Sequence, residues 1–320
     1  MRDNPAPYSI IIYTRPSISD AAAVLELMIA VDIAEYGEPD SELEDLLQEW
    51  EQIDLSQDAW LVYDRQERVV GYGKFAAVDG DFQMDFYVHP QLSPDDLRSE
   101  IISRCEKRVQ ELQISAGHQP AAELRTIASQ ANRADIAALE KYGYKPTKFY
   151  LRMQYTMDQQ PEKPSWPEGV QLRTIIQGED DCIVFEFVNR NITHAGRTPG
   201  DFERWRSWMM REDHFIPDLW FLLFADNEII GAALCYDYEE FGWVRQLAVS
   251  QNWRMRGLGA AMLQHSFHCL YSRGHQRVAL GVEAENLDAL RFYEQVGMHR
   301  VRQYNEYIKQ ISTVSTENDA

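Results

Sequence analysis

The sequence predicts an α+β fold of two tandem domains, each built on a mixed, mainly antiparallel β-sheet flanked by helices. Three observations indicate this fold: an internal repeat, a proline-rich seam between the two copies, and a mixture of strand-like and helix-like segments within each copy. The length of 320 residues also fits about two domains.

Two pairs of segments repeat in the same order along the chain. The run from Trp60 to Gly71 resembles the run from Trp220 to Gly231, and in both the Trp-to-Gly spacing is 11 residues. The runs 132–143 and 286–297 resemble each other with an Asn-to-Gly spacing of 11, and the offset between copies changes only from 160 to 154 residues. Because two matches in one order at nearly one offset rarely arise by chance, we infer a duplicated chain.

The seam between the copies lies at residues 156–169, which include three prolines and several polar residues. Such a composition disfavours regular structure. We therefore expect an amino-terminal domain at residues 1–157 and a carboxy-terminal domain at residues 165–313.

Each copy is expected to run as strand, one or two helices, a hairpin or meander, strand, helix, strand, helix and strand. Early antiparallel strands followed by a βαβ unit give one mixed sheet per copy. In the second copy, strands are expected at residues 170–174, 219–225, 229–236, 243–249, 277–282 and 300–308, and helices at 179–189, 202–211, 257–272 and 287–296.

The charge balance limits the classes of partner. The chain has 31 basic and 51 acidic residues, for a net charge of −20. This charge argues against nucleic acid and against an anionic membrane surface as partners, and it favours a cationic small molecule.

The apolar run at Tyr8–Tyr13 is too short for a secretory signal, and no stretch reaches the ~20 apolar residues of a membrane span. The four cysteines form no C-x-x-C pair, so we expect neither a disulfide framework nor a metal site. A cytoplasmic protein is the resulting expectation.

One turn carries the clearest signal of chemistry. The segment after the expected strand at 243–249 holds the pattern R-x-x-G-x-G, with Arg254, Arg256, Gly257 and Gly259 just before a helix. Glycines let the backbone approach a ligand closely, and the free amides of a helix N-terminus bind anions. The pattern therefore indicates a diphosphate cradle. It is neither a Walker A loop nor a dinucleotide fingerprint.

Further on, a strand ends near Asn286, and F-Y-x-x-x-G-M follows from Phe292 to Met298. With these motifs, residues 220–308 resemble the GNAT superfamily of N-acetyltransferases. The weaker copy at residues 60–153 extends the likeness to tandem, two-domain members, an architecture similar to that of the mycothiol synthase family.

The resemblance implies acetyl-CoA as the acetyl donor. Leu247, Ala248 and Val249 would present backbone groups to the acetyl carbonyl and the pantetheine arm, and Asn286 would hydrogen-bond that arm. The side chains of Arg254 and Arg256 would help to hold the diphosphate. The backbone amides that would bind it belong to Met255, Arg256, Gly257, Leu258, Gly259 and Ala260.

The resemblance also places Tyr293 near the sulfur, where its phenol would protonate the departing thiolate. The general base stays open. Trp243 stands where the family would have a Glu, which leaves Glu283, Glu239 and Glu240 as candidates through a water, with Glu283 the first choice. His194 and His214 fall in segments that would border the acceptor pocket, although surface positions are the simpler interpretation.

The first copy is expected to have lost the donor site. Its corresponding turn, residues 88–97, holds two prolines and two aspartates in place of the glycines and arginines, and Leu139 replaces the tyrosine. Proline lacks an amide donor and aspartate repels phosphate, so one acetyl-CoA per chain is expected. Ser93 and Pro94 fit a helix start there instead.

The acceptor is expected to be a primary amine of a small molecule. Residues 16–64 carry 14 acids and no Lys or Arg. They form either a solvated acidic face or a wall that favours a cationic amine. A protein or peptide amine as acceptor, and a non-catalytic acyl-CoA-binding protein, are the alternatives. The chain is expected to act as a monomer or a homodimer.

Overall fold

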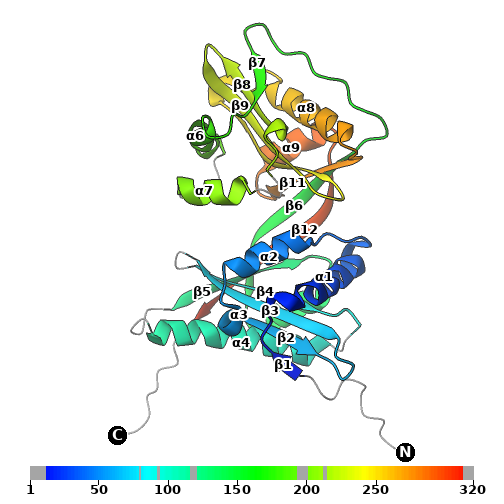
Figure 1. Cartoon of the computed structure of the whole chain (residues 1–320), viewed down its shortest axis with the longest axis vertical. Helices are drawn as coiled ribbons and strands as arrows, with labels where there is room; N and C mark the ends of the chain where they lie inside the picture. The colour runs from blue at the N-terminus through cyan, green and yellow to red at the C-terminus, as the bar shows by residue number, and fades with distance from the viewer. Residues whose placement is uncertain are drawn as a thin grey trace, which may run out of the picture. The chain divides into compact units, whose positions relative to one another are not determined.

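The structure is a computed structural model, and it describes residues 12–78, 81–91, 94–115, 121–192, 201–211 and 215–312. The chain divides into two compact units, each an α+β fold as predicted from the sequence (Figure 1). The first unit contains the chain up to Tyr150 and again from Arg302 onward, and the second contains Leu151–Val301.

The first unit has the strand order β1-β2-β3-β4-β5-β12-β6, of which β6 contributes only its start. Its strands are β1 (Ile12–Thr14), β2 (Ala59–Tyr63), β3 (Val69–Val78), β4 (Asp81–Val88), β5 (Ala122–Ser129), the start of β6 (Lys145–Thr156) and most of β12 (His299–Ile311). Its helices are η1 (Ile18–Asp20), α1 (Ala21–Tyr36), α2 (Leu43–Glu51), α3 (Leu55–Asp58), α4 (Pro94–Ser115) and α5 (Arg133–Lys141).

The second unit has the strand order β6-β11-β10-β9-β8-β7. Besides the end of β6, its strands are β7 (Gln171–Thr174), β8 (Trp220–Ala225), β9 (Glu228–Asp237), β10 (Gly242–Val249) and β11 (Arg277–Glu283). Its helices are α6 (Asp181–Asn191), α7 (Phe202–Met209), η2 (Pro217–Leu219), η3 (Gln251–Trp253), α8 (Leu258–Ser272) and α9 (Leu287–Gln295).

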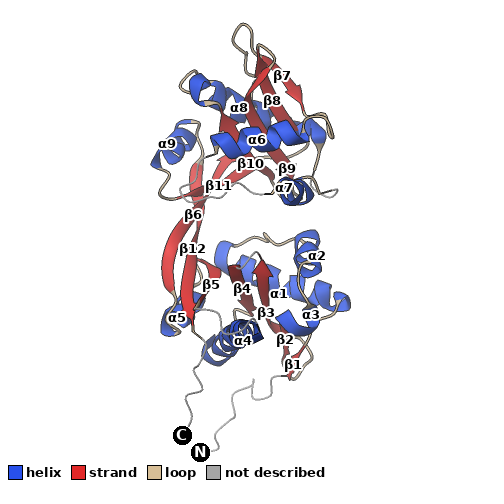
Figure 2. Cartoon of the chain, turned by 90° about the vertical axis from the view of Figure 1, so that its left-hand side faces the viewer, coloured by secondary structure: helices blue, strands red, loops and turns tan. Residues whose placement is uncertain are grey.

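Both faces of the second sheet are covered, which explains why β8 is a continuous apolar run. Trp220 and Leu222 pack with α6 and α7 on one face, whereas Phe221 and Leu223 pack with α8 on the other. Figure 2 shows α6 crossing one face of this sheet. The first unit has the same arrangement, with α1 and α2 on one face and α4 and α5 on the other.

The repeat inferred from the sequence is present as repeated geometry. Strands β2 and β3 form an antiparallel hairpin, as do β8 and β9. Asn132 Oδ1 accepts the backbone N–H of Asp135 at 3.0 Å at the start of α5, and Asn286 Oδ1 accepts that of Ala289 at 3.2 Å at the start of α9. The two asparagines are therefore equivalent helix caps.

The compact units differ from the expected segments 1–157 and 165–313 in the placement of two long strands. From Tyr304 to Ile311, β12 pairs with β5 of the first unit. The end of β6 lies next to β11 in the second unit. The last strand of each sequence repeat thus belongs in part to the sheet of the other repeat. An alternating pattern of apolar residues predicts a strand but not which strand it pairs with, so the sequence could not reveal this exchange.

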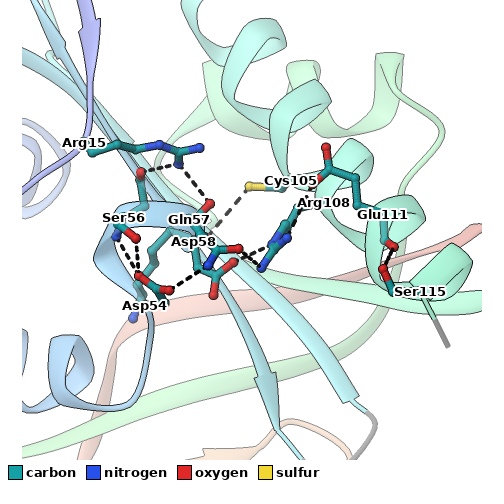
Figure 3. Close-up of polar contacts among 11 residues, drawn as sticks. Arg15, Asp54, Ser56, Gln57, Asp58, Cys105, Arg108, Glu111 and Ser115 are labelled. Carbon is teal, nitrogen blue, oxygen red and sulfur yellow. Dashed lines mark hydrogen bonds and ion pairs between the residues drawn. The ribbon is translucent and has the colours of Figure 1, made fainter.

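Polar contacts fix the entry to β2 in the first unit (Figure 3). Arg15 Nη1 donates to the backbone oxygens of Gln57, at 2.9 Å, and Ala59, at 2.7 Å. Arg108 on α4 donates through Nε to Asp58 at 2.6 Å. These bonds join the short helix α3 to both the first strand and the long helix.

Candidate functional site

A cavity of about 860 Å³ lies in the second unit. Its walls come from the ends of α6 and α7, from β10 and β11, from the loop before α8, and from α9. Equivalent segments of the first unit enclose a smaller cavity of about 300 Å³.

The larger cavity exists because two parallel strands part. Strands β10 and β11 pair only at Gly242 with Val278 and at Trp243 with Ala279. A bulge follows between Val244 and Gln246, after which β10 keeps its partner β9 alone among the described strands. The bulge bends the strand, and beyond Trp243 the edge of β10 that faces β11 has no strand partner among the described residues, so its backbone groups are open. A ligand amide can pair with such an edge.

The loop that leaves β10 ends at Gly257, the residue before α8. Gly257 has φ +79°, a left-handed conformation that a side chain would strain, and no side chain caps the helix there. The first amides of a helix have no partner within the helix. Together with the positive end of the helix dipole, they suit a diphosphate, so the residues present fit the donor.

The two arginines of this loop differ in their contacts. Arg254 donates from Nε to the carbonyl of Val249 at 3.1 Å and from Nη2 to that of Asn191 at 2.9 Å. It therefore ties the loop to the ends of β10 and α6. The guanidinium of Arg256 lies 4.7 Å from the ring centre of Trp253, and Arg256 is exposed and does not line the cavity.

Tyr293 lies on α9 and lines the cavity. Burial raises the pKa of its phenol to about 12, because the charged form loses hydration. The phenol therefore stays protonated at neutral pH. A phenol that keeps its proton in the cavity can act as a general acid toward a thiolate as it leaves.

The structure brings together nearly all of the residues that the sequence indicated. The cavity lining includes Tyr293 and Asn286, and also Leu247, Ala248, Val249, Arg254, Met255, Gly257, Leu258, Gly259 and Ala260. Met255 is fully exposed with φ 60°. Arg256 and Glu283 are the two expected site residues that do not line it.

The candidate bases lie elsewhere. Glu283 is half-buried at the end of β11, outside the cavity lining. Glu240 lies before β10 and pairs with Arg277 at 3.5 Å, and Glu239 is exposed beside it. Asp288 is the one carboxylate among the described residues of the lining. His194 and His214 lie outside the described residues.

Several lining residues were missed from the sequence. Trp205, Trp208 and Met209 come from α7, and Arg245 and Gln246 come from the bulge of β10. The guanidinium of Arg245 lies 4.5 Å from the ring centre of Trp208. Helix α7 carries no motif, but the neighbouring pair Arg245-Gln246 directly precedes the strand residues that the motif includes.

In the sequence of the first unit, the turn before α4 has none of the glycines and arginines of the loop before α8, and Leu139 stands in place of Tyr293. Helix α4 begins at Pro94, as expected, and Leu139 is fully buried in the core. The side chains of Asp95 and Asp96, and residue Ser93, lie outside what the structure describes. The smaller cavity is instead lined by acids, namely Asp32, Glu35, Asp40, Glu42, Asp45, Glu49, Asp85 and Asp135.

Two basic side chains partly neutralise the negative charge of this cavity. Lys74 pairs with Glu49 and, at 3.2 Å, with Asp85, and Arg98 pairs with Asp135 at 2.5 Å. Burial raises the pKa of Glu35 above its usual range, against the hydrogen bond that Asn132 donates to it. The acidic segment 16–64 thus lines a cavity of its own unit.

Within the described ranges, no group of three or more His, Cys, Asp or Glu side chains is arranged to hold a metal ion. None of the helices described is both long and apolar enough to cross a bilayer.

These features define a tandem GNAT protein, and comparisons with known proteins agree. Residues 185–298 match the model of the acetyltransferase (GNAT) family. The crystal structure of a GCN5-related N-acetyltransferase from Sphaerobacter thermophilus is 30% identical, with a TM-score of 0.81 over 94% of this chain and 96% of that one. The chain therefore belongs to the GNAT family of acetyltransferases.

Other similarities are more distant. A tandem GNAT protein from the clavulanic acid biosynthesis pathway shares the fold, with a TM-score of 0.73 over 95% of this chain and 99% of that one, at 14% identity. Mycothiol acetyltransferase of Streptomyces coelicolor is 30% identical over 137 residues, 42% of this chain and 44% of the relative. N-alpha-acetyltransferase 30 of Schizosaccharomyces pombe is 27% identical over 99 residues, 29% of this chain and 66% of the relative.

Proposed function

We propose that the second unit transfers an acetyl group from acetyl-CoA to a primary amine of a small molecule, by direct attack in a ternary complex. One observation carries this proposal: the uncapped start of α8, the open edge of β10 and the phenol of Tyr293 all line one cavity. Holding both substrates there supplies the effective concentration that the reaction needs.

The chain would bind the donor mostly through its backbone. The first amides of α8, from Leu258 onward, would hold the diphosphate, and Arg254 would keep the loop in place. The open edge of β10 from Leu247 to Val249 would pair with the pantetheine arm. Asn286 already uses Oδ1 as a helix cap, which leaves its amide N–H groups for the same arm.

Bound acetyl-CoA supplies an acetyl thioester, whose C–S bond breaks as a C–N bond forms with the amine. A backbone N–H of β10 would donate to the carbonyl oxygen and stabilise its developing charge. Tyr293 would give its proton to the departing sulfur, and the proton lost by the amine would restore the phenol through solvent.

Asp288 is the one carboxylate in the described lining that could take a proton from the amine. The side chain of Asp288 is fully exposed on α9. We therefore propose that the amine reacts in its neutral form and releases its proton to water. Glu283 remains a proposed base only through a water chain, since it lies outside the lining.

A second candidate acceptor is the α-amine of a peptide. The similarity to N-alpha-acetyltransferase 30 favours it. Nothing in the described lining favours a peptide over a small amine.

The test combines calorimetry with coenzyme A and an assay of free thiol released from acetyl-CoA by a panel of amines and peptides. Thiol release with a small amine supports the proposal, and release with peptides alone replaces it with the second candidate. If coenzyme A binds but no acceptor causes thiol release, the protein is instead a non-catalytic acyl-CoA-binding protein.

A further inference from the structure

At the end of the cavity away from the start of α8, where the proposed donor contacts leave room for the acceptor, the described lining includes aromatic rings and one cation. This end is called the acceptor end. Trp205 is 8% exposed and Trp208 is 54% exposed, and both face the cavity from α7 together with Met209. Arg245 enters from β10. Glu and His side chains are absent from the described part of the lining.

Arg245 is separate from the diphosphate cradle. It precedes Val249 by four residues, which is about 13 Å along an extended strand, and the cradle follows Val249. The other arginine of the lining, Arg254, is bonded to two carbonyl oxygens. Asp288, the one acid in the described part of the lining, lies on α9 with its carboxylate 3.9 Å from the guanidinium of Arg291. Among the described residues, Arg245 is therefore the cation of the lining whose charge no neighbouring acid or carbonyl group offsets.

Within the described residues, no hydrogen bond or ion pair occupies the donors of Arg245. It is the bulged residue of β10, without a Cα partner on β9, and its guanidinium lies 4.5 Å from the ring centre of Trp208. Arg245 forms no ion pair with any residue in the described ranges. A guanidinium resting on a ring still presents its in-plane N–H groups, and these match a carboxylate as two parallel hydrogen bonds.

We infer that the acceptor carries a carboxylate beside its primary amine, and that Arg245, held on Trp208, binds this carboxylate. This inference rests on the proposed function and specifies its substrate class. It departs from the cationic acceptor that the net charge suggested. The acidic residues of segment 16–64 line the cavity of the first unit, whereas the described lining in the second unit carries Arg245 and Arg254. A nearby guanidinium also lowers the pKa of the amine, which favours the neutral nucleophile.

The experiment uses the full chain and matched pairs of acceptors. The pairs are α-, β- and γ-amino carboxylates, including L-phenylalanine and L-methionine, each against its own carboxamide. The best carboxylate should exceed its carboxamide in kcat/KM by about 10- to 100-fold, the range of hydrogen bonds to a charged group. Arg245→Met should remove this preference, and Arg245→Lys should restore part of it.

Arg204→Met is the matched control. Arg204 lies on α7 but is exposed and outside the cavity lining, so its loss should leave the preference unchanged. Calorimetry with coenzyme A should give the wild-type affinity for Arg245→Met, which shows that the variant folds. The acetylated product of the best carboxylate should bind Arg245→Met more weakly by a factor similar to the loss of kcat/KM.

Two results separate the inference from the proposed function. If carboxamides react as well as carboxylates, or if Arg245→Met lowers both members of a pair equally, the carboxylate site is wrong and the acetyltransferase remains. If no amine in the panel releases thiol although coenzyme A binds, the proposed function itself fails.

Discussion

Gly259 lies against Phe292, so that a Cβ at residue 259 would be 3.2 Å from Cζ of the ring. The contact packs the first turn of α8 onto α9, whose next residue is Tyr293. Direct packing therefore fixes the start of α8, the proposed diphosphate cradle, relative to the phenol of Tyr293. Changes in the loop should consequently affect both donor affinity and the position of the proton donor.

Gly257→Val should weaken binding of coenzyme A by at least tenfold. The left-handed φ of +79° costs a residue with a Cβ about 1–2 kcal/mol, and more when it is β-branched, so the loop would change conformation. Calorimetry measures the affinity and also the number of sites, which should be one per chain in the wild type.

Gly178→Val is the control for this variant. Gly178 has φ +87° with no atom within 4 Å of its Cβ position, and it lies outside the cavity lining. Gly178→Val should lose about as much stability as Gly257→Val and keep the wild-type affinity for coenzyme A. Equal loss of affinity in both variants would indicate a general effect of strain. Unchanged affinity for coenzyme A in Gly257→Val would show that the loop at Gly257 does not bind the diphosphate.

Tyr293→Phe should lower kcat by about 100-fold or more and leave the affinity for coenzyme A nearly unchanged, because only the transferable proton is removed. Since the phenol pKa is raised to about 12, wild-type kcat should show no alkaline loss from this group below about pH 10. Steady-state kinetics across pH provide the measurement. Tyr271→Phe, on α8 outside the lining, should retain wild-type kcat. A fully active Tyr293→Phe would exclude the phenol as the acid.

Glu35→Gln should raise the free energy of unfolding at pH 7. The folded-state pKa of Glu35 is raised by burial, so ionisation costs stability as pH rises from the unfolded pKa through the folded one. A glutamine escapes this cost and can still accept the hydrogen bond from Asn132. Urea unfolding at pH 7 and pH 4 should show a gain at the higher pH that disappears at the lower.

Glu26→Gln on the same helix is the control, because Glu26 is exposed. It should change stability little at either pH. A loss of stability in Glu35→Gln at pH 7 would show that the charge of Glu35 supports the fold.

Asp237→Asn should have the opposite pH dependence. Burial raises the pKa of Asp237, but hydrogen bonds from His275 and Arg273 outweigh it and leave the pKa below its usual value. A lowered folded-state pKa gives stability above the unfolded pKa, which is lost as pH falls through the folded value. The variant should lose about 1–3 kcal/mol at pH 7, the cost of breaking hydrogen bonds to a charged group.

Urea unfolding provides this measurement too, and the difference from wild type should shrink below about pH 4. Glu228→Gln, exposed at the start of the same strand, should be neutral. A difference that stays constant from pH 7 to pH 3 would mean that packing, and not charge, accounts for the loss.

The sequence predicted most of the fold because several signals agreed at each element. The caps Asn132 and Asn286, the paired hairpins and the glycine pattern before α8 each combine a local propensity with a fixed spacing. The two-domain α+β fold and the GNAT family were therefore recognised correctly. The exchange of β6 and β12 was missed, because long-range strand pairing leaves no local trace.

The candidate site divides in the same way. The proposed donor half depends on the glycine loop before α8 and on α9, which Asn286 caps. Both features are local in sequence, so the sequence indicated Gly257 and Tyr293. The proposed acceptor half depends on the contact between Trp208 and Arg245, which are 37 residues apart in sequence and come together only through the packing of α7 on the sheet. The placement of Glu283 outside the lining is likewise a matter of where β11 diverges from β10.

The pairing of β12 with β5 also affects how the protein is made. The second unit is one continuous stretch of chain, from Leu151 to Val301, whereas β5 of the first unit lacks one of its partners until Tyr304–Ile311 has been synthesised. During translation, β5 is therefore unpaired on one side while the second unit is completed. Such an open edge invites intermolecular pairing, so nascent chains truncated before residue 304 should be prone to aggregate.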